Sequence, residues 1–188
     1  MRAAIFAGPG SITVADRPDP VVVAPTDAVV RVLLACVCGS DLWYYRGQSD
    51  YRRGTPIGHE FVGVVEQVGP LVHEIAEGDL VVAPFRYSDG TCPHCRAGLT
   101  SSCVAGSMWG RKGVDGGQGE AVRVPFAGAT LVRVPGANHS AETMASLLAL
   151  SDVMATGHHA AVSAGVGRGS VVAVVGDGAV GLSAVIAA

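Results

Sequence analysis

Short apolar runs separated by turn residues make up most of the chain as far as Pro135. Runs that are rich in β-branched residues and bounded by glycine, proline or acidic residues are typical of β-strands. Their close spacing predicts a β-rich, barrel-like domain. The runs are AAIFAGPGSITVAD, DAVVRVLLACVC, FVGVVEQVG, GDLVVAPF, EAVRVPF and ATLVRVP.

The pattern becomes helical near His139, in the stretch NHSAETMASLLALSD. The spacing i, i+3, i+4 and i+7 predicts a helix that packs on one face, with Ser140 as its N-cap. A second helical stretch, ATGHHAAVSAG, follows and ends at glycine. The residues at that spacing are Met144, Leu147, Leu148 and Ser151.

The stretch GSVVAVVGDGAVGLSAV places Gly176, Gly178 and Gly181 at GxGxxG spacing between a β-branched run and a helix. In a dinucleotide-binding turn these glycines allow the tight turn, the approach of the pyrophosphate and the close packing of helix on strand. The context therefore predicts a nucleotide site, although a simple glycine-rich turn would show the same pattern. The segment from Ser170 to Ala188 is apolar, but Asp177 and the glycines argue against a membrane span.

Two domains are expected from this organisation. Residues 1–150 would form the β-rich domain, and residues 151–188 would supply a linking helix and the first strand and helix start of a nucleotide-binding domain. A βαβ unit needs roughly 30 residues, and the acidic residue that holds the ribose lies about 20 residues beyond the glycines. We therefore expect the chain to be a fragment.

Composition and charge narrow the expected partners. Hydrophobic residues make up 49% of the chain and charged residues 15%, as in soluble globular proteins. The net charge is -3 and the basic residues are scattered, so neither nucleic acid nor a membrane surface is an expected partner. A small molecule is expected instead. The odd count of 5 cysteines and the absence of a secretory pattern favour thiols or metal ligands in the cytoplasm.

Cysteine and histidine residues form two candidate metal sites. The stretch SDGTCPHCRAGLTSSC holds Cys92, Cys95 and Cys103, and a zinc site of this kind needs a fourth ligand. Cys38 and His59 offer a thiolate and an imidazole for a catalytic zinc, which typically keeps three protein ligands and one open position. Without their neighbours, such residues in a β-rich domain would more often belong to the core.

Several motifs together resemble the zinc-dependent medium-chain alcohol dehydrogenases. The stretch GHEFVGVVEQVGPLV is similar to the zinc-binding signature of that family. The motifs CGSD, GDLVV, SDVMATGHHAAV, the cysteine cluster and the GxGxxG extend the resemblance over the whole chain in the family's order. The resemblance implies a β-rich GroES-like barrel domain of the α+β class, followed by the truncated start of an α/β Rossmann domain that binds NAD or NADP.

The resemblance also implies the residues of the catalytic machinery. Cys38, His59 and Asp152 are similar to the ligands of a catalytic zinc, with Asp152 standing where many members have cysteine. Glu60 is similar to a glutamate that lies behind the zinc or briefly joins it, and Ser40 to the hydroxyl that passes on the substrate proton.

For the cofactor, Thr156 resembles the residue that touches the nicotinamide, and the three glycines of the GxGxxG would bind the dinucleotide.

A structural zinc is implied for the cysteine cluster. In the family, cysteines spaced by two, two and seven residues bind this zinc, and Asp89 stands where the first cysteine would be. A carboxylate can bind zinc at about 2.0 to 2.2 Å, so Asp89, Cys92, Cys95 and Cys103 form the implied set. His94 is a competing ligand that we expect to point outward, and an empty lobe with free or oxidised thiols is the alternative.

Other positions carry weaker expectations. Trp43 stands where many relatives have a proton-relaying histidine, and because an indole cannot relay protons in this way, Trp43 is instead a candidate for narrowing the substrate pocket. Cys36 is expected to be a buried thiol on a strand, and Asp41 to brace its loop. Asp152 has the N-cap of the following helix as an alternative role. Surface or capping positions are expected for His73, His139, His158 and His159.

The combined pattern predicts a zinc-dependent oxidoreductase that interconverts an alcohol and an aldehyde or ketone by hydride transfer to or from NAD(P). We expect the chain to be inactive by itself and the full-length protein to be a homo-oligomer. The alternatives are a zinc-free quinone-oxidoreductase-like reductase of the same superfamily and a non-enzymatic zinc-binding module. Relatives of the first alternative usually lack the pair formed by Cys38 and His59.

Overall fold

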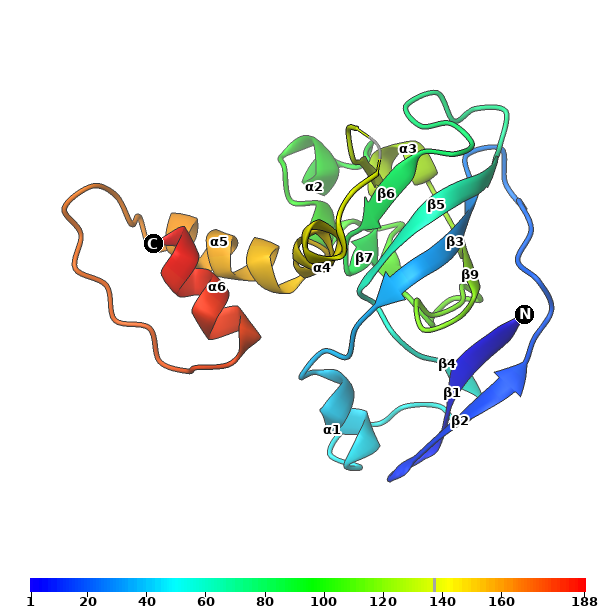
Figure 1. Ribbon diagram of the computed structural model, residues 1–188, viewed down its shortest axis with the longest axis horizontal. Helices are drawn as coiled ribbons and strands as arrows, with labels where there is room; N and C mark the ends of the chain where they lie inside the picture. The colour runs from blue at the N-terminus through cyan, green and yellow to red at the C-terminus, as the bar shows by residue number, and fades with distance from the viewer. Residues whose placement is uncertain (137) are drawn as a thin grey trace.

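The computed structural model describes residues 1–136 and 138–188. Its β-rich body contains a five-stranded antiparallel sheet, in the order β10-β6-β5-β3-β9, and a three-stranded sheet, in the order β2-β1-β4 (Figure 1). Strands β7 (Arg86–Tyr87) and β8 (Ser107–Met108) pair separately. The larger sheet consists of β3 (Ala28–Ala35), β5 (Phe61–Val68), β6 (Leu80–Ala83), β9 (Ala121–Val124) and β10 (Val132–Arg133). The smaller sheet consists of β1 (Arg2–Gly8), β2 (Ser11–Asp16) and β4 (Thr55–Pro56).

The pairing of β3 with β5 forms the centre of the larger sheet. Ala28 lies opposite Val68 and Ala35 lies opposite Phe61, with two irregularities of register between these ends. Phe61 is fully buried, and its ring meets that of Trp109 edge-on, with 5.0 Å between the centroids. Burial of an aliphatic or aromatic side chain of this size stabilises the fold by about 1.5–3 kcal/mol. The core beneath the sheet also contains Val30, Val65, Val81, Val122 and Val124.

Aromatic rings connect the smaller sheet to α1 (Asp41–Tyr45). Phe6 of β1 meets Tyr44 and Tyr51 edge-on, with 5.5 Å between the centroids in each pair. The rings of Tyr44 and Tyr51 are stacked at 4.3 Å. Because α1 follows directly after Ser40, this cluster fixes the loop that carries several candidate site residues.

Short helices and turns connect the remaining strands. They are α2 (Pro93–Arg96), the 3-10 turn η1 (Thr100–Ser102) and α3 (Ala127–Thr130).

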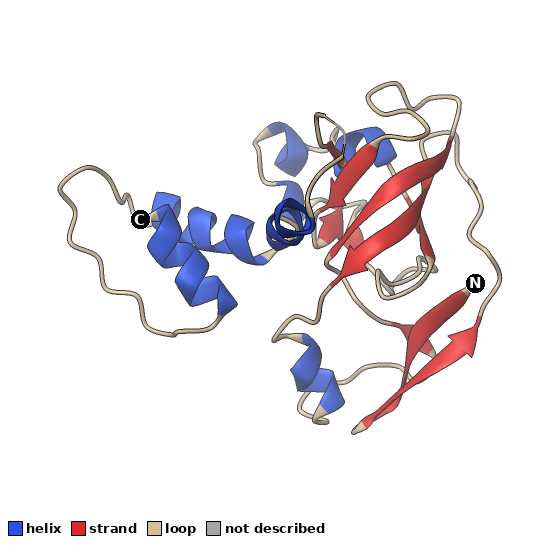
Figure 2. Ribbon diagram, in the orientation of Figure 1, coloured by secondary structure: helices blue, strands red, loops and turns tan. Residues whose placement is uncertain are grey.

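The longer helices gather at one side of the body, far from the N-terminus (Figures 1 and 2). Helix α4 (Ala141–Ala149) packs against β3 and β5, and the Ser140 hydroxyl accepts a hydrogen bond from the Thr143 amide at 3.1 Å, as expected for an N-cap. Helices α5 (Val153–Ser163) and α6 (Ala179–Ala187) pack against each other. A Cβ added to Gly157 would lie 2.6 Å from the Ala184 amide nitrogen, so glycine permits this contact.

The prediction of a strand for the β-branched run after Ser170 is wrong. Residues 170–177 form a loop, and α6 begins after it as predicted. The side chains of Val171 and Val175 are fully exposed, and no segment of the described residues pairs with this run. A strand is stabilised by a hydrogen-bonded neighbouring strand. The β-branched composition of residues 170–177 alone is therefore not enough to form a strand. No helix among the described residues is long and apolar enough to cross a membrane.

We predict that Gly63→Ala destabilises the larger sheet. A Cβ at Gly63 in β5 would collide with the Arg31 carbonyl oxygen and with Cγ1 of Val30 on β3. Overpacking of this kind costs about 1–3 kcal/mol of unfolding free energy. The control is Gly167→Ala, whose Cβ would meet nothing within 4 Å among the described atoms and should change stability by less than about 0.5 kcal/mol. Denaturant unfolding of both variants checks this, and equal midpoints would contradict the role of Gly63.

Candidate active site

Four potential metal ligands converge beside the larger sheet: Cys38, His59, Glu60 and Asp152. One ligand atom from each lies within 4.8 Å of those from the others. Oδ2 of Asp152 is 3.5 Å from Nε2 of His59 and 3.8 Å from Sγ of Cys38. The side chains come from the loop after β3, the turn before β5 and the start of α5, so the fold brings together residues that are distant in sequence.

The strand pairing places His59 and Glu60 near Cys38. They immediately precede β5, and the loop that carries Cys38 follows β3, so both segments leave the sheet at the same end. Gly58 has a φ of 92°, a conformation that favours glycine. A Cβ there would also lie 2.6 Å from the Gln118 amide nitrogen, which explains why glycine precedes His59.

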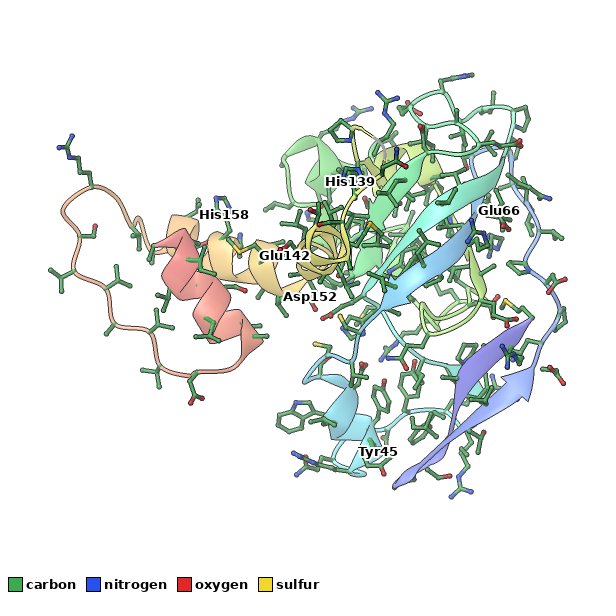
Figure 3. All side chains as sticks on the ribbon, viewed as in Figure 1. Tyr45, Glu66, His139, Glu142, Asp152 and His158 are labelled. Atoms are coloured by element: carbon green, nitrogen blue, oxygen red, sulfur yellow. The ribbon has the colours of Figure 1, made fainter. Side chains whose placement is uncertain are left out.

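The turn between α4 and α5 positions Asp152, which lies between the helices and the end of the sheet (Figure 3). The neighbouring Ser151 is 1% exposed, and its carbonyl accepts a hydrogen bond from the Phe85 amide at 3.0 Å. Asp152 does occupy the N-cap position of α5, but its side chain makes no capping bond in the described structure. Its Oδ1 accepts a hydrogen bond from the Thr156 hydroxyl at 2.7 Å, and its Oδ2 faces His59.

Two carboxylates flank the buried ring of His59. Nδ1 lies 3.3 Å from Oδ1 of Asp41, and Nε2 faces Asp152. Burial alone would lower the pKa of His59, but the hydrogen bonds to Asp152 and Asp41 outweigh it and raise that pKa to about 12. Burial would likewise raise the pKa of Asp152, yet its hydrogen bonds with His59 and Thr156 lower it.

Asp41 braces its loop as predicted and has a further contact that the sequence did not indicate. Its Oδ2 accepts the Cys38 amide at 3.0 Å, and its Oδ1 accepts the Tyr44 hydroxyl at 2.6 Å. The additional contact with Nδ1 of His59 orients the ring so that Nε2 points into the cluster. Carboxylates that orient a metal-binding histidine in this way are common around zinc.

The donor set fits a zinc ion. With zinc–ligand bonds of about 2.0 to 2.3 Å, tetrahedral ligand atoms lie about 3.3 to 3.8 Å apart. The separations of 3.5 and 3.8 Å from Asp152 to His59 and Cys38 fall in that range. Glu60 is 3% exposed, and its Oε1 atom is buried without a hydrogen-bond partner in the described structure. An orphaned buried carboxylate oxygen is costly unless a cation or a donor satisfies it.

Cys36 differs from its prediction. It lies just beyond the end of β3 and is only half-buried, rather than being a buried thiol within the strand. Its Sγ donates a short hydrogen bond to Oε2 of Glu60. Burial, as the larger cause, and this hydrogen bond together raise the pKa of the Cys36 thiol to about 12.

A cavity of about 250 Å³ opens beside His59. Ser40 lines it, and its hydroxyl makes no capping bond to α1 in the described structure. Trp43 is 58% exposed and is not one of the residues that line this cavity, so the structure does not support the idea that it narrows the pocket. The other residues around the cavity are Asp41, Tyr44, Ser49, Asp50, Tyr51, Gly58, Met108, Trp109 and Arg111.

The cysteine cluster forms a second group of potential ligands: Asp89, Cys92, Cys95 and Cys103. The three cysteine side chains are buried, and Sγ of Cys92 lies 3.5 Å from Sγ of Cys95. Oδ1 of Asp89 accepts hydrogen bonds from the amides of Cys92 at 3.0 Å and Thr91 at 2.9 Å, which lower the pKa of this carboxyl. His94 is exposed and does not belong to the group, in agreement with an outward orientation.

The remaining histidines are mostly peripheral. His73, His158 and His159 are exposed, as predicted. His139 is half-buried instead, and its Nε2 is buried without a partner among the described residues.

The sequence also resembles known proteins. The family model of the alcohol dehydrogenase GroES-like domain matches residues 24–136, more than half of the chain. The chain belongs to this alcohol dehydrogenase family. The GroES-like, β-rich fold expected from the motifs is thereby confirmed.

Individual relatives of the chain point to the same family. A medium chain reductase/dehydrogenase of Acremonium sp is 41% identical over 100% of the chain and 65% of its own length. A probable zinc-binding alcohol dehydrogenase of Mycobacterium tuberculosis is 39% identical, covering 98% of the chain and 47% of the relative. The alcohol dehydrogenase TADH of Thermus sp. ATN1 superposes with a TM-score of 0.90 at 38% identity, over 98% of the chain and 54% of that structure. The chain thus spans about half to two thirds of the length of such relatives.

We predict that Tyr44→Phe destabilises the loop that carries the candidate site. The variant keeps the stacked ring but removes the hydroxyl that donates to buried Asp41 at 2.6 Å. A hydrogen bond to a charged group contributes about 1.5–3 kcal/mol. Thermal unfolding should show this loss, whereas Tyr45→Phe, at a 39% exposed neighbour, should have little effect. Equal stability of the two variants would be inconsistent with this role of Tyr44.

Proposed function

We propose that this chain carries the zinc site of an enzyme that interconverts an alcohol and an aldehyde or ketone with NAD or NADP. The convergence of Cys38, His59 and Asp152 beside a cavity carries the proposal, and Asp152 lies at tetrahedral ligand separations from the other two. Membership of the alcohol dehydrogenase family supports the reaction class. In this proposal Glu60 would be an additional ligand within reach of the same ion.

The side chains around the cavity would bind and orient the substrate. Zinc at the cluster would supply Lewis acidity, which lowers the pKa of an alcohol. Ser40 lines the cavity together with His59, so its hydroxyl would accept the substrate proton while passing its own proton on toward solvent. The apolar surfaces of Met108 and Trp109 would exclude water, while Arg111, 5.8 Å from the centre of the Tyr51 ring, offers a polar group at the exposed side.

The glycine-rich turn would bind the dinucleotide. Gly176 has a φ of 118°, and a Cβ on Gly181 would collide with the Gly176 carbonyl oxygen, so both positions require glycine. Gly178 is the N-cap of α6, whose first amides would face the pyrophosphate. The hydroxyl of Thr156 donates a hydrogen bond to Oδ1 of Asp152. The residue proposed to contact the nicotinamide is thus hydrogen-bonded to a proposed metal ligand.

A second zinc ion would brace the lobe of Asp89, Cys92, Cys95 and Cys103. The 3.5 Å separation of the Cys92 and Cys95 sulfurs is compatible with a shared tetrahedral ion. None of these four residues lines the cavity beside His59, which favours a structural role.

The wider organisation follows from the same proposal. Residues 1–150 would form the zinc-carrying domain and residues 151–188 the start of the nucleotide-binding part. The working enzyme would be a cytoplasmic homo-oligomer.

We predict that His59→Ala removes one zinc ion and the activity. The wild-type chain should contain two zinc ions and the variant one, as measured by elemental analysis. In protein expressed from the complete coding sequence, alcohol-dependent reduction of NAD+ or NADP+ should fall roughly 100-fold or more, because the Lewis acid contributes several kcal/mol to the transition state. His158→Ala, at an exposed histidine on α5, serves as the control and should behave like the wild type.

Two outcomes would contradict this function. Wild-type rates in a folded His59→Ala variant would remove the cluster from the mechanism. A wild-type protein that contains no zinc but reduces quinones would identify the zinc-free reductase instead.

We further predict that Asp89→Ala lowers the zinc content of the lobe while His94→Ala does not. Asp89 belongs to the ligand group, whereas His94 lies outside it and is exposed. Zinc content after dialysis against a weak chelator measures the difference. The opposite pattern, with zinc lost only in His94→Ala, would identify His94 as the fourth ligand.

A further inference from the structure

Cys36 and Glu60 form a cross-strand pair at the edge of the metal cluster. The register that places Ala35 opposite Phe61 brings the next residue of each segment, Cys36 and Glu60, opposite each other. The Cys36 amide donates to the Glu60 carbonyl at 3.3 Å and so extends the ladder by one step beyond both strands. On its other side, the Cys36 carbonyl accepts Nε2 of Gln118 at 3.0 Å. The backbone of Cys36 is thus held by hydrogen bonds on both sides.

The two carboxylate oxygens of Glu60 have different environments. Oε2 accepts the thiol of Cys36. Oε1 is buried and has no hydrogen-bond partner among the described residues. Glu60 as a whole is only 3% exposed. A ligand atom of Glu60 lies within 4.8 Å of those of Cys38, His59 and Asp152. The thiol therefore occupies Oε2 and leaves Oε1 without a partner, while this carboxylate stays within reach of the cluster.

We propose that Cys36 is a positioning residue that holds Glu60 by Oε2 and thereby presents Oε1 to the metal. This inference rests on the proposed zinc site and adds a residue to it. Removing the thiol frees the carboxylate to rotate away from the cluster, which weakens metal binding. Substitution of a residue that orients a metal ligand in this way typically lowers the metal affinity roughly 10- to 100-fold.

The experiment measures Co²⁺ binding by the visible absorption of the thiolate-ligated ion. The absorption that disappears in Cys38→Ser belongs to this cluster, and the absorption that remains belongs to Co²⁺ bound at the cysteine lobe. In Cys36→Ala, the apparent affinity of this cluster for Co²⁺ should fall roughly tenfold, and the shape of its absorption band should change. Cys36→Ser keeps a donor and should restore most of the wild-type behaviour. Val37→Ala, at the 68% exposed neighbour, is the control and should leave the signal unchanged.

A double-mutant cycle with Glu60→Ala distinguishes positioning from packing. If Cys36 acts through Glu60, Cys36→Ala should have no further effect on Co²⁺ binding in the Glu60→Ala background. An undiminished effect in that background would overturn the proposal. So would wild-type affinity and band shape in Cys36→Ala. A wild-type chain without any Cys38-dependent signal would instead refute the proposed zinc site, and this role of Cys36 with it.

Discussion

The antiparallel register between β3 and β5 determines where most of the candidate site lies. With Ala35 opposite Phe61, the segments that carry Cys38 and His59 leave the sheet at one end and on neighbouring paths. A slip of one residue would turn every side chain of a strand to the opposite face. The buried Phe61 and Val65 oppose such a slip, so the apolar core fixes the geometry of a polar site.

The site concentrates charge that the rest of the domain must tolerate. Asp41, His59 and Glu60 are all buried, and burial of charged groups is unfavourable unless they are paired. Hydrogen bonds satisfy Asp41 and His59, whereas one oxygen of Glu60 is left without a partner in the described structure. The stability of the sheet and of the aromatic cluster around Tyr44 offsets this cost. A cation at the cluster would relieve it.

Periodicity predicted most of the fold but little of the site. The strands of the larger sheet and the capped start of α4 follow from local spacing, which a single segment contains. The strand expected after Ser170 failed because a strand also depends on a partner. The implied ligands came from resemblance to a family, not from spacing. The contacts of Asp41 with His59 and of Cys36 with Glu60 had no local signal, because they arise only when distant segments pair.

Asp152 enters the cluster from the turn between α4 and α5, whereas Cys38 and His59 belong to the β-rich body. An ion shared by these ligands would therefore be a cross-link between two parts of the chain that otherwise meet mainly through α4. Its affinity and the orientation of α5 would be thermodynamically linked. Any ligand that shifts α5 and α6 would then change how tightly the ion is held, and loss of the ion would change the affinity for that ligand by the same factor.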